Sequence, residues 1–109
     1  MVGYPPAMPD YPGDSEGAEM NTVIHKFRLI GHDTQVELPE SAVVRHVAEH
    51  RGDYCIWAQL DPTARHVLRR FCVYATGETM EENSKRKFVG TFLSHGGALV
   101  WHVFEEPLR

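Results

Sequence analysis

The sequence predicts an all-β fold, namely a compact antiparallel sandwich or rolled barrel of six to eight short strands. Two apolar runs of about seven residues flank Gly96-Gly97, a length that suits strands better than helices. Other segments alternate apolar and polar residues, and Gly, Pro and Asp residues separate them. A chain of 109 residues suits one domain with a modest core.

The N-terminal stretch, residues 1–21, is predicted to stay outside that domain. It contains four of the seven prolines and no lysine or arginine, and it shows no periodicity. We expect a disordered or extended tail, followed by a single β-rich domain over residues 22–109. The alternative is an acidic arm that docks on a neighbour through Tyr4 and Tyr11.

The first half of the domain contains two alternating segments. In the segment 23–30, Phe27 and Leu29 share one face, while Lys26 and Arg28 lie on the other, which indicates a half-buried strand. Gly31-His32-Asp33 predicts a turn, and the segment 34–38 predicts a second strand that ends at Pro39. We expect these two strands to pair as a hairpin.

The next segments are assigned by the same criteria. Residues 41–50 fit either a strand with three valines or a helix capped by Ser41, and we favour the strand. The segments 54–60 and 68–76 predict further strands, joined by a polar loop that begins at Asp61-Pro62. The charged residues 77–86 have no period and predict a surface loop.

The segment 89–105 is predicted to be the central hairpin. With Gly96 and Gly97 as the central residues of a type I′ turn, Phe92 faces Trp101 and Leu93 faces Val100. A three-residue loop that includes His95 would shift this register. With the shorter loop, one face carries Phe88, Phe92, Leu99, Trp101 and Val103, and the other carries Val89, Leu93, Val100 and Phe104.

Both faces of this hairpin are apolar, so both need cover from the same chain or from a partner. We therefore expect a homo-oligomer, with either Val100 and Phe104 or Leu99 and Val103 at the centre of its interface. Trp57 and Trp101 lie in the most apolar segments and are predicted to be core residues.

Composition narrows the choice of partner. The net charge of −4 gives no basic surplus, so nucleic acid is not the expected partner. No apolar run approaches the length of a membrane span, and the N-terminus has no secretory signal pattern. Cys55 and Cys72 sit in apolar segments and are expected to be buried, reduced thiols.

One motif raises the possibility of catalysis. The residues His46, Glu49 and His50 match H-x-x-E-H, a zinc-peptidase pattern that requires a helix. On a strand, the two histidines are about 13 Å apart, too far to share one metal ion. A metal-dependent hydrolase that uses these three residues is the alternative to a non-enzymatic function.

Other polar residues suggest no active site. Seven histidines are scattered without metal-ligand spacing, so we expect no metal and no cofactor. Ser94 and His95 are adjacent, and neighbouring strand residues point to opposite faces, which argues against a catalytic pair. The basic residues Arg65, Arg69, Arg70, Lys85, Arg86 and Lys87 could hold an anion, and we favour solvation of strand ends.

Four motifs occur in order: E-L-P at 37–39, I-W-A-Q-L-D-P at 56–62, F-C-V-Y-A-T-G at 71–77 and V-G-T-F-L-S-H-G-G-A-L-V-W-H-V-F-E at 89–105. Over residues 23–105 the chain resembles a family of small uncharacterised proteins of tailed bacteriophages and prophages, most specifically through the last motif. The resemblance implies a phage origin and a β-rich domain, and it brings no catalytic residues.

These observations predict a non-enzymatic, phage-encoded binding or assembly module. It is expected to be either a virion component or an accessory protein that binds a host protein or a small ligand. Its expected location is the host cytoplasm or the virion.

Overall fold

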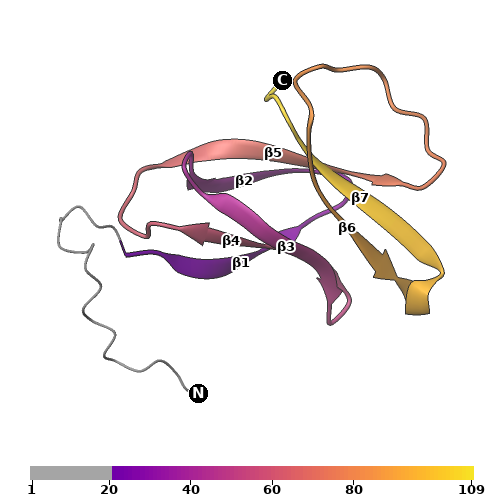
Figure 1. The fold of residues 1–109 in the computed structure, drawn as a ribbon, viewed down its shortest axis with the longest axis horizontal. Helices are drawn as coiled ribbons and strands as arrows, with labels where there is room; N and C mark the ends of the chain where they lie inside the picture. Colours follow the sequence, from indigo (N-terminus) through magenta and orange to yellow (C-terminus); the bar gives the residue numbers. More distant parts are fainter. Residues whose placement is uncertain (1–20) are drawn as a thin grey trace, which may run out of the picture.

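The computed structural model describes residues 21–109, which form seven antiparallel strands and one short 3₁₀ turn (Figure 1). The strands are β1 (Val23–Leu29), β2 (Asp33–Pro39), β3 (Val43–His50), β4 (Asp53–Leu60), β5 (His66–Ala75), β6 (Lys87–Ser94) and β7 (Leu99–Glu106); the turn is η2 (His95–Gly97). The predicted all-β class is therefore confirmed. The predicted tail falls outside the described residues, apart from Asn21.

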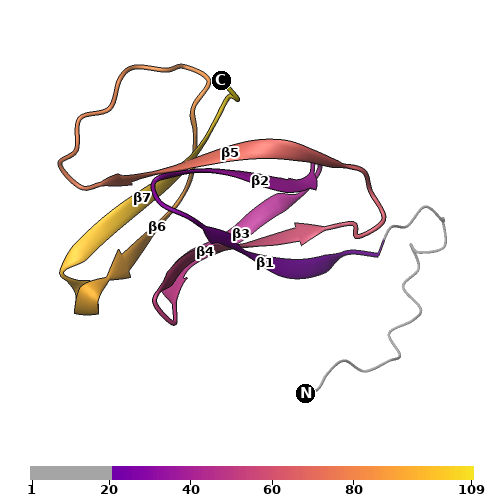
Figure 2. The ribbon, with the colours of Figure 1, turned by 180° about the vertical axis from the view of Figure 1, so that it is seen from behind.

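Two sheets pack against each other as an open sandwich. One is a three-stranded sheet in the order β1-β4-β3, and the other is a four-stranded sheet in the order β2-β5-β7-β6. The opposite views in Figures 1 and 2 show β6 and β7 at a steep angle to β1 and β4 and to one side of them. The core between the inner faces is apolar and consists of Leu29, Val36, Leu38, Ala42, Val47, Ile56, Ala58, Leu60, Phe71, Val73, Phe92 and Val103.

The expected hairpin of the first two strands is wrong. β1 pairs with β4, and β2 pairs with β5, so the chain crosses from one sheet to the other after β1. The crossing is tight: Gly31 has φ +76°, and Thr34 Oγ1 hydrogen-bonds both the N–H (2.8 Å) and the carbonyl (2.9 Å) of Ile30. Alternation predicts which face of a strand is buried, but it does not identify the strand beside it.

The central hairpin has the register that the Gly96-Gly97 turn predicts. Phe92 pairs with Trp101 and Leu93 with Val100. The N–H of Ala98 donates to the carbonyl of His95 (3.1 Å), and both glycines have positive φ, at 66° and 96°. His95 also has positive φ (56°), so β6 ends at Ser94 and the connection is longer than two residues.

A β-bulge between Phe88 and Gly90 changes the predicted faces of the hairpin. Phe88 pairs with Phe104, so it lies on the outer face and not beside Phe92 as expected. Val89 packs against the core instead. One extra residue in a strand reverses the alternation on one side of the bulge.

The two predicted core tryptophans have different environments. Trp101 packs against the core and contacts the Tyr54 ring at 5.5 Å. The prediction for Trp57 is wrong: its side chain is half-buried on the outer face of the three-stranded sheet, where its ring contacts the rings of His46 and His50. It lies there because its neighbours in β4, Ile56 and Ala58, face the core. Cys55 and Cys72 are buried free thiols, as predicted.

Candidate functional site

The outer face of the β6–β7 hairpin exposes a patch of large apolar side chains, here named the hairpin surface: Phe88, Leu93, Val100 and Phe104. Phe88 is 60% exposed and Leu93 is 56% exposed, while Val100 and Phe104 are half-buried. The rings of Phe88 and Phe104 meet edge to face, with centroids 5.4 Å apart. A patch of this kind on a small domain is typical of a protein interaction site.

The four predicted interface residues are divided between the two faces of the hairpin. Val100 and Phe104 belong to the hairpin surface, beside Phe88 and Leu93. Val103 is fully buried in the core, so it cannot reach a partner. Leu99 is 40% exposed and pairs with the buried Ser94 at the end of the hairpin. Sequence reasoning missed Phe88 because the bulge that turns it outward has no signature in the residues around it.

A cluster of ion pairs lies on the same outer face, around Glu106, which is only 7% exposed. Arg86 donates to its carboxylate (2.8 Å), Tyr74 donates to the same oxygen (2.5 Å), and Arg70 lies 3.7 Å away. Arg70 also makes a bidentate contact with Asp33 at 3.0 and 2.9 Å. We name these five residues the arginine cluster.

The arginine cluster shifts the proton affinities of its members. Burial raises the pKa of Glu106, but the hydrogen bonds from Tyr74 and Arg86 and the charges of the arginines outweigh it, so the pKa lies below its usual value. Burial, reinforced by the hydrogen bond to Glu106, raises the pKa of Tyr74 to about 12. Glu106 is thus held as a carboxylate and Tyr74 as a neutral phenol.

Residues 77–86 and the C-terminus cover this cluster. The guanidinium of Arg86 also donates to the carbonyl of Glu81 (2.7 Å), and Arg70 donates to the carbonyl of Pro107 (3.0 Å). A cavity of about 400 Å³ remains between the segment and the sheet. Carboxylates face the guanidinium groups of Arg70 and Arg86, so we interpret the cluster as a clamp that holds the covering segment.

Another arginine, Arg69, links several segments at one end of the sandwich. Arg69 makes a bidentate contact with Glu105 (2.7 and 2.8 Å) and donates to the carbonyls of Pro39 and Ala42. The expectation that Arg69, Arg70 and Arg86 solvate strand ends is therefore wrong. Each has a carboxylate partner that lies far away in sequence, so no local pattern of residues identifies it.

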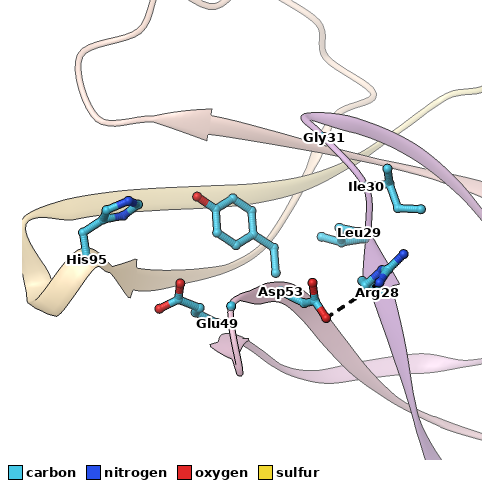
Figure 3. A pocket seen from close by; sticks show the side chains of 9 residues that line it. Arg28, Leu29, Ile30, Gly31, Glu49, Asp53 and His95 are labelled. Atoms are coloured by element: carbon cyan, nitrogen blue, oxygen red, sulfur yellow. Dashed lines mark ion pairs between the residues drawn. The ribbon is translucent and has the colours of Figure 1, made fainter.

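A pocket of about 530 Å³ lies at one end of the sandwich (Figure 3). His95 stands at one side, and Arg28 and Asp53, paired at 3.8 Å, stand at the other. Ser94 Oγ lies 2.9 Å from His95 Nδ1, so these residues do meet, contrary to expectation. The positive φ of His95 turns its ring back toward Ser94.

The contact between Ser94 and His95 is structural in character. Ser94 is only 2% exposed, and its hydroxyl oxygen accepts the indole N–H of Trp101 (2.9 Å). A substrate has no access to an oxygen that is buried and already engaged in this way. The pair instead anchors the Trp101 side chain beneath the hairpin turn.

The H-x-x-E-H residues lie on strand β3, which confirms the strand prediction. Glu49 pairs with Tyr54 and lines the end pocket, whereas His46 and His50 pack on Trp57 at the outer face. The glutamate therefore points away from the two histidines. Among the described residues, no group of three or more His, Cys, Asp or Glu side chains is placed to hold a metal ion. No helix in the described part of the chain is long and apolar enough to cross a membrane.

Comparison with known proteins gives a family match. The family model for the domain of unknown function DUF7352 matches residues 20–109 of the chain. No curated protein and no solved structure matches it.

Proposed function

The chain belongs to the DUF7352 family of domains of unknown function, and on this premise we propose that it is a non-enzymatic binding or assembly module that self-associates through the hairpin surface. The observation that carries this proposal is the exposure of Phe88 and Leu93 beside Val100 and Phe104. Burying that patch stabilises an assembly by roughly 25 cal/mol per Å² of apolar area.

A second copy of the chain is the simplest partner. A two-fold axis brings the same patch of each subunit together, so one apolar surface provides both sides of the interface. The four side chains of the hairpin surface are uncharged, and Thr91 and His102 pair between them on the same face. A stable dimer needs to bury more than about 1,000 Å² in total, so neighbouring exposed residues such as Thr91 join the interface.

The family resemblance in the segment 89–105 extends this proposal to a phage context. The module is then a virion component or an accessory protein that binds a host protein or a small ligand, and it acts in the virion or the host cytoplasm. Proteomics of purified phage particles distinguishes the two roles, because a virion component is present at fixed copy number and an accessory protein is absent.

Self-association is tested by sedimentation velocity at micromolar concentration. The unmodified chain is expected to sediment as a dimer, and Leu93→Glu is expected to give a monomer, because a buried unpaired carboxylate opposes the interface. The matched control is Ile24→Glu, since Ile24 is 57% exposed on the other sheet. A monomeric unmodified chain, or equal dissociation of both variants, contradicts the proposal.

A further inference from the structure

The outer face of the three-stranded sheet carries a row of side chains across all three strands. Trp57 on β4 is paired with Lys26 on β1 and with His46 on β3. His50 follows on β3, with its Nδ1 3.2 Å from the ammonium of Lys26. Lys26, His46 and His50 are exposed, and Trp57 is half-buried among them. We name this side of the sheet the tryptophan face.

A β-bulge concentrates cationic groups there. The register shifts between Val44 and His46, which makes Arg45 the extra residue of β3. Arg45 Nε donates to Gln59 Oε1 (3.0 Å), while the ring of the next residue, His46, contacts Trp57. Two consecutive side chains therefore lie over the same face, where an unbroken strand places only one.

The local charge differs from the charge of the whole chain. Lys26, Arg28 and Arg45 are exposed on the tryptophan face, and Asp53 is the one acidic residue that the pairing of the described strands places there. Four of the fifteen acidic residues lie in residues 1–20, which leaves eleven, equal to the eleven lysines and arginines of the remaining chain. The net charge of −4 thus comes from the N-terminal stretch, and this face is positive.

We propose that the tryptophan face binds single-stranded nucleic acid. Trp57 stacks on a base, and Lys26, Arg28 and Arg45 contact phosphates around it. An aromatic platform with surrounding cations is the arrangement that binds single strands without reading their sequence. A duplex fits less well, because its bases are stacked on each other and unavailable to an indole ring.

This surface does not overlap the hairpin surface, which belongs to the other sheet. The inference therefore goes beyond the proposed self-association and does not depend on it. A dimer formed through the hairpin surface leaves the tryptophan face of each subunit open.

The test is the fluorescence anisotropy of a labelled oligodeoxythymidylate of about 15 nucleotides, titrated with the full chain at about 50 mM salt. With three phosphate contacts, the logarithm of the binding constant is expected to fall against the logarithm of salt with a slope of about −2. A flat salt response, or no binding at tens of micromolar protein, overturns the proposal.

Two variants separate stacking from charge. Trp57→Ala is expected to weaken binding by between about fivefold and 150-fold, with little change in the salt slope. Lys26→Gln combined with Arg45→Gln is expected to reduce the slope to about −0.7, as one phosphate contact remains. The matched control is Lys85→Gln combined with Lys87→Gln, which removes the same charge from exposed sites in the loop before β6 and at the start of β6, and it is expected to keep the slope.

A sulfated polysaccharide serves as the competing anionic polymer. If it binds as tightly as the oligonucleotide, and Trp57→Ala leaves both affinities unchanged, the face is an anion surface and the nucleic-acid proposal is wrong. Circular dichroism and thermal melting of each variant establish that it is folded. If Trp57→Ala does not fold, Trp57→Leu and the double charge variant test the nucleic-acid proposal in the same way.

Discussion

The outer faces of the two sheets are built from similar alternating strands and have opposite environments. On the three-stranded sheet, Lys26, Arg28 and His46 are exposed, and Trp57 is half-buried beside them. On the four-stranded sheet, Arg70 and Glu106 are 9% and 7% exposed, although their side chains also point away from the core. The difference arises because residues 77–86 and the C-terminus cover the part of the four-stranded sheet around Glu106, although they leave the hairpin surface exposed. Alternation therefore sets the direction of a side chain, while irregular segments decide whether it meets water.

The largest expected difference is between the two tryptophans, one inside the sandwich and one on its open face. Trp101→Ala is expected to lower the free energy of unfolding by roughly 3–5 kcal/mol, because it opens a cavity against the core and leaves Ser94 Oγ without its donor. Trp57→Ala is expected to cost about 1 kcal/mol. Urea denaturation of both variants measures this gap, and equal losses would show that Trp57 is a core residue after all.

The second prediction concerns the covered face. Glu106→Gln keeps the shape of the side chain and removes the charge that faces Arg70 and Arg86, so it is expected to destabilise by about 2–3 kcal/mol. Asp53→Asn is the control on the open face, where the pair with Arg28 is about half exposed and its loss is expected to change little. Similar effects of the two substitutions would contradict the view that the covering segment shields the arginine cluster.

The comparison also shows which features the sequence could predict. The short apolar run over 54–60 correctly predicted a strand, and Gly96-Gly97 correctly predicted the pairing of Phe92 with Trp101. Whether β1 pairs with β2 or with β4 depends on contacts between distant segments, so the local pattern did not predict it. The bulge at Arg45 and the bulge between Phe88 and Gly90 have no distinctive residues. Simple alternation therefore does not predict that Arg45 and Phe88 lie on the outer faces of the sheets. The burial of Arg70 and Glu106 depends on a loop without any periodicity.

The pH dependence of stability is the third prediction. The hydrogen bond from Arg70 is the main cause that lowers the pKa of Asp33, and the pKa of Glu106 is lowered as well. Both groups bind protons more weakly in the folded state, so their contribution is present above their usual values near pH 4 and is lost as the pH falls through the folded values. Acid titration of the free energy of unfolding should show this loss, and Glu106→Gln should reduce it.

At the alkaline end, the relevant group is Tyr74. Its pKa rises from 10.0 to about 12 in the folded state, so the neutral phenol favours folding, and stability is expected to fall as the pH rises through this window. Tyr74→Phe removes the phenol and should flatten the curve there. A curve unchanged by this substitution would show that other groups, such as the buried thiols, control the alkaline loss.

The fourth prediction tests how closely the two sheets approach at their edges. A Cβ at Gly90 on β6 would lie 2.8 Å from Val47 Cγ2 on β3, so Gly90→Ala is expected to cost about 1–3 kcal/mol. Val47→Ala in the same chain makes room for the added methyl group, and the double variant should lose less than the sum of the two single variants. If the two losses of stability were strictly additive, the predicted contact between position 90 and Val47 would be contradicted.

The smallest expected effect returns to the open face. Arg28 and Asp53 lie 3.8 Å apart with side chains 58% and 48% exposed, and water screens a pair of this kind well. A double-mutant cycle of Arg28→Gln and Asp53→Asn should therefore give a coupling below about 0.5 kcal/mol. Arg28→Gln should nevertheless weaken oligonucleotide binding, because a phosphate approaches the guanidinium from solvent and needs no buried partner. An open binding face requires residues of this kind, which contribute little to stability but weaken binding when they are replaced. Strong coupling between Arg28 and Asp53 would instead show that Arg28 has a structural role, as Arg70 and Arg86 have.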